Sequence, residues 1–164
     1  FIMLSRSHYG FVKRLLEIEI PELSDGTIML YSVARDAGSR SKIAVYTEYT
    51  NVDPIGAVIG EKGRRIANVL KELSGEKIDV ILYDKDPVKF IANALSPAKD
   101  VIVSIKDETK KAALALVNDK NLSLAIGKKG QNVKLASRLT HYKIEVKPEE
   151  QENTETTEET SAEE

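Results

Sequence analysis

Apolar positions along residues 7–84 switch between the period of a helix and the period of a strand. Phe11, Leu15 and Ile18 recur at helical spacing, whereas Ile43 and Val45 alternate with other residues, as in a strand with one buried face. We therefore expect the order αββααβ. The predicted elements are a helix over 7–20, strands over 27–34 and 42–47, a helix over 54–59, a second helix closed by Gly75, and a strand over 77–82.

Turn-forming residues set the limits of these elements. We expect Pro21 to end the first helix and the polar run 35–40 to form the loop of a β-hairpin. Asp53 followed by Pro54 indicates a helix start, because Asp is a good N-cap and Pro fits the first helical position. The helix that ends before Gly75 carries one apolar stripe, made of Ile66, Val69, Leu70 and Leu73.

The second half of the chain repeats this order. Val12-Lys13 before Pro21 matches Val88-Lys89 before Pro97 at the same offset, 76 residues. The predicted elements are a helix from Asp86-Pro87 to Ser96, strands over 100–106 and 111–117, helices over 120–126 and from 131 to about 139, and a strand over 143–146. We expect an α+β fold with two domains, 1–84 and 85–147, each containing a three-stranded sheet.

Both halves place an Ile-Gly-x-x-Gly turn between their last two helices, at residues 59–63 and 126–130. Backbone N–H groups at a helix N-terminus favour an anion, and the helix dipole adds to this preference. Glycine at both corners permits positive φ and removes Cβ atoms that would hold a phosphate away. One such turn is weak evidence, since glycine turns between helices are usually structural. Two in matching places suggest one long sugar-phosphate ligand.

Composition adds an uneven distribution of charge. The net charge is −2, but residues 148–164 contain eight Glu and no Lys or Arg, which leaves 24 basic and 18 acidic residues before them. This basic body weakly favours a polyanionic partner. The tail consists mostly of Glu and Thr, cannot bury a core and is expected to be disordered. It serves solubility, or its carboxylates compete with a nucleic acid for the basic turns.

Several classes of chemistry lack the residues they need. The chain has no Cys, and His8 and His141 lie far apart, so we expect no disulfide, metal site or cofactor. It has no nucleotide-binding loop and no paired nucleophile and base, so we expect no enzyme. No apolar run approaches the ~20 residues of a membrane span, so we expect a cytoplasmic protein without membrane contact. Because residue 1 is Phe, we expect a fragment of a longer chain.

The repeated turn in two αββααβ units resembles the K-homology (KH) domain in its type II, prokaryotic form, which clamps about four nucleotides of single-stranded RNA. A closer resemblance is to the paired KH domains of the NusA family of bacterial transcription termination and antitermination proteins. It covers residues 2 to 147 and rests on Leu4 to His8 and on the runs NVDPIGA at 51–57, GEKID at 75–79, FIANALSPAK at 90–99 and LSLAIGK at 122–128.

This resemblance implies an elongation factor that contacts the nascent transcript and influences pausing, termination and antitermination. RNA polymerase and antitermination factors would be partners of the full-length protein. The predicted RNA-binding residues are Ile59, Gly60, Glu61, Lys62, Gly63, Arg64 and Arg65 in the first domain, and Ile126, Gly127, Lys128, Lys129, Gly130, Gln131, Asn132 and Lys134 in the second.

The roles of these residues differ. The glycines would shape the clamps, and the Lys and Arg side chains would contact phosphates unless they form an ordinary solvated surface. Glu61 departs from the basic character of the turns and should weaken the first clamp relative to the second. Gln131 and Asn132 would hydrogen-bond sugar, phosphate or a base edge, or else cap the helix. Ile59 and Ile126 would line an apolar groove edge or belong to the core.

The mode of base reading follows from the composition of the turns, and one alternative function stays open. The turns have no Phe or Tyr nearby, so base reading would depend on base edges and aliphatic contact rather than on stacking. The chain would otherwise be a protein-interaction module that docks RNA polymerase or partner factors and binds little RNA of its own.

Overall fold

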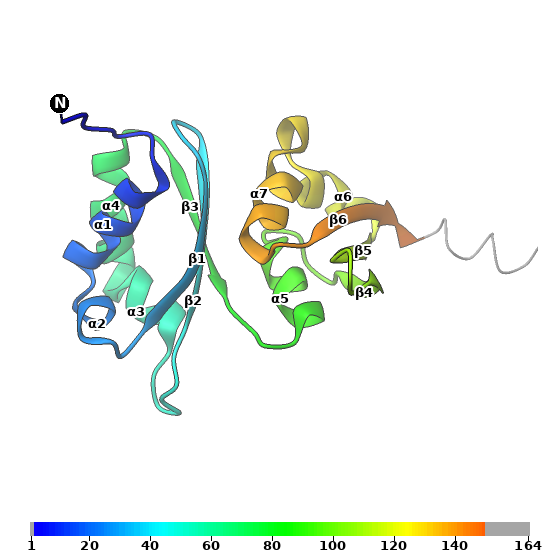
Figure 1. Cartoon of the computed structure of the whole chain (residues 1–164), viewed down its shortest axis with the longest axis horizontal. Coiled ribbons are helices and arrows are strands. Elements are labelled where there is room, and N and C mark those ends of the chain that lie inside the picture. The colour runs from blue at the N-terminus through cyan, green and yellow to red at the C-terminus, as the bar shows by residue number, and fades with distance from the viewer. Residues whose placement is uncertain (1, 150–164) are drawn as a thin grey trace, which may run out of the picture. The chain divides into compact units, whose positions relative to one another are not determined.

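The computed structural model describes residues 2–149, which form two units of the same topology (Figure 1). The chain passes from the first unit to the second between Lys85 and Asp86. Each unit contains a three-stranded sheet whose middle strand is antiparallel to one neighbour and parallel to the other. The predicted α+β fold with two αββααβ units is confirmed.

In the first unit the helices cover one face of the sheet (Figure 1). Its elements are α1 (Tyr9–Glu19), α2 (Pro21–Asp25), β1 (Met29–Asp36), β2 (Arg40–Tyr46), α3 (Pro54–Ile59), the 3₁₀ turn η1 (Glu61–Gly63), α4 (Arg64–Leu73) and β3 (Lys77–Leu82). The α3–η1–α4 segment is the crossover between the parallel strands β2 and β3, so the fold itself places the first glycine turn between two helices.

The second unit has the same crossover between β5 and β6. Its elements are α5 (Pro87–Ala94), β4 (Ile102–Asp107), β5 (Ala112–Val117), α6 (Asp119–Ile126), the 3₁₀ turn η2 (Lys128–Gly130), α7 (Gln131–Thr140) and β6 (Lys143–Pro148). Leu135, Ala136 and Leu139 of α7 are almost fully buried, which anchors the helix that follows the second turn.

The first core explains why α3 and α4 are held firmly. Ile43 and Val45 are fully buried as predicted, but β2 does not have one buried face only, since Lys42 and Ala44 are fully buried as well. Val69 and Leu73 of the predicted stripe are also buried. The cluster consists of Val12, Leu16, Ile20, Ile28, Ile43, Val45, Val58, Val69 and Leu73. Burying a side chain of this size contributes about 1.5–3 kcal/mol, so the turn sits on a stable platform.

Besides shifts of one or two residues at several element ends, three details differ from the predictions. Pro21 does not simply follow a helix but begins the short helix α2, because its fixed φ fits the first helical position. The hairpin loop is shorter than 35–40, since Arg35 and Arg40 lie in strands and their side chains pair with Glu76 and Asp79. Strand β6 continues to Pro148, and the rest of the predicted disordered tail, from residue 150, lies outside the described residues.

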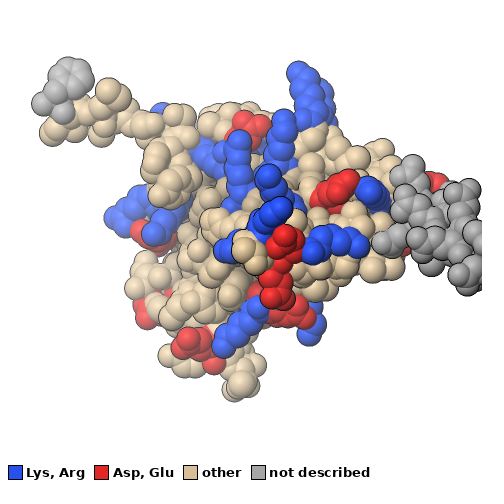
Figure 2. Space-filling model, turned by 45° about the vertical axis from the view of Figure 1, so that its right-hand side comes forward, with Lys and Arg blue, Asp and Glu red and all other residues tan. Residues whose placement is uncertain are grey.

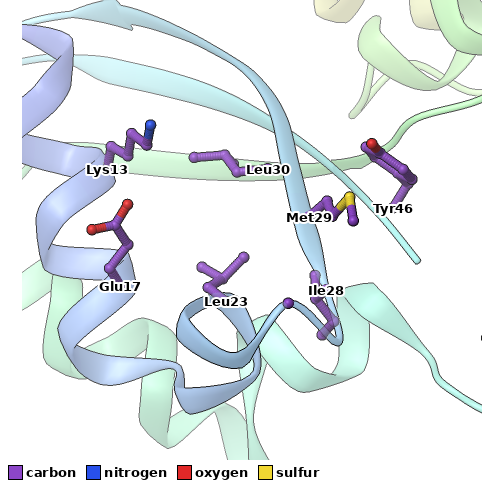
Figure 3. Close-up of a pocket in the computed structure, with 8 residues that line it drawn as sticks. Lys13, Glu17, Leu23, Ile28, Met29, Leu30 and Tyr46 are labelled. Atoms are coloured by element: carbon purple, nitrogen blue, oxygen red, sulfur yellow. The ribbon is translucent and has the colours of Figure 1, made fainter. Parts of the chain in front are cut away.

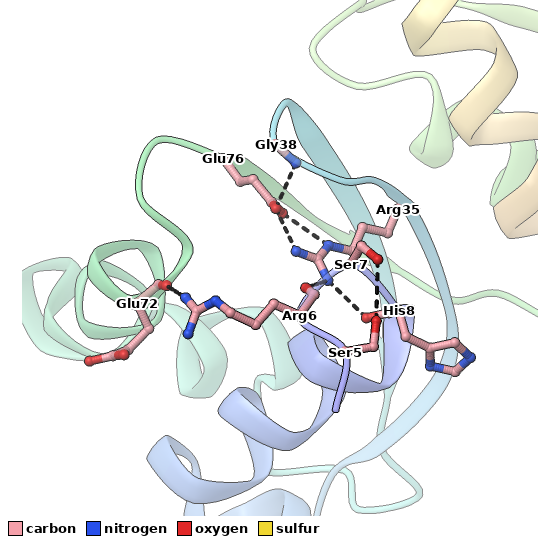
Figure 4. A network of polar contacts seen from close by, with 8 residues as sticks. All are labelled: Ser5, Arg6, Ser7, His8, Arg35, Gly38, Glu72 and Glu76. Atoms are coloured by element: carbon pink, nitrogen blue, oxygen red, sulfur yellow. Dashed lines mark hydrogen bonds and ion pairs between the residues drawn. The ribbon is translucent and has the colours of Figure 1, made fainter. Parts of the chain in front are cut away.

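A buried ion pair ties the segment before α1 to the sheet (Figure 4). Arg35 and Glu76, with side chains only 5% and 3% exposed, form two hydrogen bonds of 3.2 and 2.5 Å. Nη1 of Arg35 also donates to the carbonyls of Arg6 and His8 at 2.6 and 2.8 Å. The Gly38 N–H donates to Glu76 at 2.8 Å, so the buried carboxylate is fully partnered.

Candidate nucleic-acid interface

The two glycine turns have the same backbone conformation. Gly60 and Gly127 have φ of 80° and 76°, with ψ of 172° in both. Their N–H groups end the preceding helices by donating to the carbonyls of Gly56 and Ser123, each at 2.9 Å. The last two residues of each turn also have positive φ; they are Lys62 and Gly63 in the first turn and Lys129 and Gly130 in the second. The sequence repeat is thus also a repeat of geometry.

The two glycines of a turn serve different purposes. A Cβ on Gly60 would lie 2.7 Å from Cγ of Arg65, and a Cβ on Gly127 would lie 2.7 Å from the backbone N of Asn132. By contrast, a Cβ on Gly63 would meet nothing within 4 Å. Both glycines have positive φ, but the first also permits the chain to pack closely on itself, while the second leaves the outer side open to a ligand.

Exposed cations surround both turns. Lys62 and Arg64 are exposed at the first turn, and Lys128, Lys129 and Lys134 are exposed at the second. Helices α4 and α7 have ten residues each, and no side chain caps their N-termini. Such a helix end presents N–H donors and the positive end of the dipole to an anion. Glu61 is also exposed, and its carboxylate opposes this attraction.

Apolar residues flank the turns unevenly. Ile59 is 36% exposed and Leu124 is 46% exposed, so both present aliphatic surface beside a turn. Val58 is fully buried and belongs to the core. Ile126 and Gln131 are half-buried. Aliphatic contact with a base is therefore available next to each clamp.

Asn132 differs from its predicted role. Its side chain is 1% exposed, and Nδ2 donates to the carbonyls of Ala125 at 2.9 Å and Leu95 at 3.1 Å. It therefore cannot reach a nucleic acid from where it lies. Helix capping, the alternative to an RNA contact, is closer to what is observed, although the capped groups belong to the ends of α6 and α5.

Arg65 is also engaged inside the protein. Nη1 donates to Glu22 of α2 at 2.7 Å and to the carbonyl of Ala57 at 2.9 Å. The hydrogen bond from Arg65 lowers the pKa of Glu22 below its usual 4.5. A shallow hollow beside the first turn is lined by Glu22, Gly56, Ala57, Gly60, Glu61, Arg64 and Arg65. Sequence periodicity does not reveal these roles of Arg65 and Asn132, because Glu22 and Leu95, their partners, are distant in sequence.

The positive charge of the body belongs entirely to the second unit. Residues 1–85 contain twelve basic and twelve acidic residues, whereas residues 86–147 contain twelve basic and six acidic ones. Several cations of the first unit are also paired with carboxylates, as Arg35, Arg40 and Lys42 show. Figure 2 shows Lys and Arg side chains on the surface in view, with Asp and Glu side chains between them. The two turns therefore lie in unequal electrostatic surroundings.

A second hollow lies away from the turns, between α1, α2 and the start of β1 (Figure 3). Charged Lys13 and Glu17 of α1 lie at one side, and apolar side chains such as Leu23 and Ile28 lie at the other. No residue of either glycine turn lines it. Within residues 2–149, no helix is long and apolar enough to cross a membrane, and no group of His, Asp and Glu is placed to hold a metal ion.

Comparison with known proteins agrees with this architecture. Residues 6–83 match the model of the NusA-like first KH domain, and residues 87–154 match that of the NusA-like second KH domain. A crystal structure of APE1850 has the same fold, with a TM-score of 0.58 and 22% identity over 82% of this chain and 96% of that one.

Three bacterial relatives share the name transcription termination/antitermination protein NusA. The Bacillus subtilis protein is 55% identical over 150 residues, and the Halalkalibacterium halodurans protein 53% over 148, each covering 90% of this chain. The Mycobacterium tuberculosis protein is 53% identical over 146 residues, or 89% of this chain. The chain spans only 38%, 40% and 42% of the H. halodurans, B. subtilis and M. tuberculosis proteins. The resemblance is confirmed: the chain belongs to the NusA family and contains its two tandem KH domains.

Proposed function

We propose that this chain binds single-stranded RNA, such as a nascent transcript, through both glycine turns. In the full-length protein this binding would contribute to transcription pausing, termination and antitermination, alongside contacts with RNA polymerase and antitermination factors. We assign no catalytic role to the chain, and we expect it in the bacterial cytoplasm, where transcription takes place.

One observation carries the proposal. The same open turn, with the same dihedral angles and exposed cations, occurs twice at the N-terminus of an uncapped helix. A helix N-terminus and flanking lysines attract phosphate, and an open second glycine gives the sugar-phosphate backbone close access. The KH topology supports single-stranded rather than duplex RNA, because the clamp holds about four unpaired nucleotides.

The two clamps should contribute unequally. Lys128 and Lys129 occupy the middle of the second turn, where the first turn has Glu61 and Lys62. The second unit also carries the whole positive excess of the body. Phosphate contacts provide most of the affinity of a nucleic-acid-binding surface, so we expect the second clamp to dominate affinity. The first clamp would extend the bound length.

The direct test is the binding of a ~12-nucleotide single-stranded RNA across a salt series, beside shorter strands and a duplex of the same sequence. We expect binding that requires the longer strand, rejects the duplex, and weakens with a log-log slope of about −0.7 for each phosphate neutralised. Absent or length-independent binding would instead favour the protein-interaction module.

Charge reversal within the turns locates the site. We expect Lys128→Asp with Lys129→Asp to abolish most binding, and Lys62→Asp to shorten the bound length. A matched control is Lys110→Asp with Lys111→Asp, another exposed lysine pair in the same unit. The Lys111 carbonyl accepts the N–H of Lys143, so this pair lies beyond the C-terminal end of α7, away from the turn. Equal losses in both pairs would mean that only net charge matters.

A further inference from the structure

We propose that Arg65 and Asn132 are positioning residues that brace the two turns from behind and do not themselves bind RNA. The inference rests on the proposed function, since it names what keeps each RNA clamp in shape. Both residues stand five positions after the first glycine of their turn, as the second residue of α4 or α7. Sequence reasoning places both among the RNA contacts.

The first observation is a shared packing contact. A Cβ on Gly60 would lie 2.7 and 2.9 Å from Cγ and Cβ of Arg65, and a Cβ on Gly127 would lie 2.8 Å from Cβ of Asn132. Carbon atoms in normal contact are about 3.5–4.0 Å apart, so any side chain on the first glycine would displace the brace. Each first glycine is therefore matched to the residue five positions later.

The second observation is a shared hydrogen bond. Arg65 donates to the carbonyl of Ala57 at 2.9 Å, and Asn132 donates to the carbonyl of Ala125 at 2.9 Å. Ala57 and Ala125 lie in the last turns of α3 and α6, where carbonyls have no partner within their own helix. Each brace therefore ties the helix before a turn to the helix after it, and fixes the angle at which the turn presents its outer N–H groups.

Each brace also reaches a third element. Arg65 pairs with Glu22 of α2 at 2.7 Å, and Asn132 donates to the carbonyl of Leu95, just after α5, at 3.1 Å. The two side chains differ in their surroundings, because Arg65 is 31% exposed and Asn132 is 1% exposed. The brace of the first clamp is thus an ion pair near the surface, which a surface substitution can break. The brace of the second clamp is an uncharged side chain inside the core.

Removing Glu22 distinguishes a brace from a phosphate contact. If Arg65 bound phosphate directly, Glu22→Ala would free its guanidinium, delete a negative charge and tighten RNA binding. A brace predicts the opposite, because Arg65 loses its anchor. At high salt, which screens the effect of the deleted charge, we expect Glu22→Ala to weaken RNA binding about fivefold, which corresponds to the loss of one hydrogen bond. Glu72→Ala is the matched control, because it deletes an exposed carboxylate at the far end of α4.

The salt dependence of Arg65→Gln supplies a second, independent readout. Loss of a phosphate contact would reduce the log-log salt slope by about 0.7, whereas loss of a brace lowers affinity at every salt concentration and leaves the slope unchanged. Asn132→Leu, which keeps the volume but removes both donors, should weaken binding in the same slope-neutral way. Circular dichroism of each variant checks that it folds. If Asn132→Leu does not fold, Glu22→Ala still tests the proposal, because Glu22 is partly exposed.

The results separate this inference from the proposed function. If the unmodified chain binds no RNA, the proposed function fails. If the chain binds RNA and Glu22→Ala binds as well or better at high salt, or if Arg65→Gln reduces the salt slope, the brace is refuted and Arg65 is an RNA contact. Weaker binding of Glu22→Ala at an unchanged slope, with Glu72→Ala unaffected, supports the brace.

Discussion

Exchanging the charges of Glu61 and Lys128 tests the inequality of the two clamps. The two residues hold the same place in turns of the same conformation, so they are a direct difference in charge between the clamps, beside Arg64 in the place of Gln131. Glu61→Lys changes the local charge by two units. A unit charge about 4 Å from a phosphate is worth roughly 1 kcal/mol in water, so the change is worth about 2 kcal/mol. That corresponds to about 30-fold tighter binding at low salt.

Fluorescence anisotropy of a labelled ~12-nucleotide RNA at low and physiological salt measures the effect. We expect Lys128→Glu to weaken binding by a similar or larger factor, and both effects to shrink as salt screens them over about 8 Å. Glu72→Lys, which makes the same change of net charge at the far end of α4, is the control. If Glu72→Lys tightens binding as much as Glu61→Lys does, or if Glu61→Lys has no effect, the reasoning about the first clamp is wrong.

Four further predictions concern the fold and the tail. Gly60→Ala should lower the free energy of unfolding, measured with urea, by more than about 2 kcal/mol because its Cβ meets Arg65. Gly63→Ala lies in open space and should lower it only by the roughly 1–2 kcal/mol that positive φ costs. Arg35→Ala should lower the free energy of unfolding by about 3–5 kcal/mol, since it leaves the buried carboxylate of Glu76 without its guanidinium partner. A loss below about 1 kcal/mol would contradict the network. Burial raises the pKa of Glu76, but the hydrogen bonds from Arg35 and the Gly38 N–H outweigh it and lower the pKa below 4.5. Its carboxylate therefore stabilises the fold above pH ~4.5, and this stability is lost as the pH falls through the lowered pKa, so urea midpoints of Glu76→Gln should vary less with pH below 4.5. Ending the chain at Lys147 should tighten RNA binding at low salt if the acidic tail competes; unchanged affinity would rule competition out.

The sequence predicts the fold well because its signals are local and occur twice. The apolar period around Ile43 and the Gly-x-x-Gly turns each depend on a few neighbouring residues, and the repeat of the whole order supports each assignment. The limits of the hairpin loop are predicted less accurately. Arg35 and Arg40 have the composition of loop residues, and their acidic partners, Glu76 and Asp79, are distant in sequence.

The site is predicted less completely for the same physical reason. Lys62 and Lys128 are exposed beside the turns, in agreement with their expected position, although RNA contact itself stays a prediction. Arg65 and Asn132 read as surface residues of an amphipathic helix, yet their partners Glu22 and Leu95 lie 43 and 37 residues away. The equal offset of five from each first glycine was the available signal, but it identifies no partner.

The anchoring of residues 6–8 also determines how mechanical load enters the first unit. Arg6 donates to the carbonyl of Glu72 at 2.9 Å, near the end of α4, while its own carbonyl is held by Arg35 (Figure 4). A pull on the chain before Arg6 would therefore reach α4 and the β1–β2 hairpin directly, as well as α1 through the backbone. Tension applied there is therefore expected to be shared among α1, the C-terminal end of α4 and β1, rather than carried by the backbone of α1 alone.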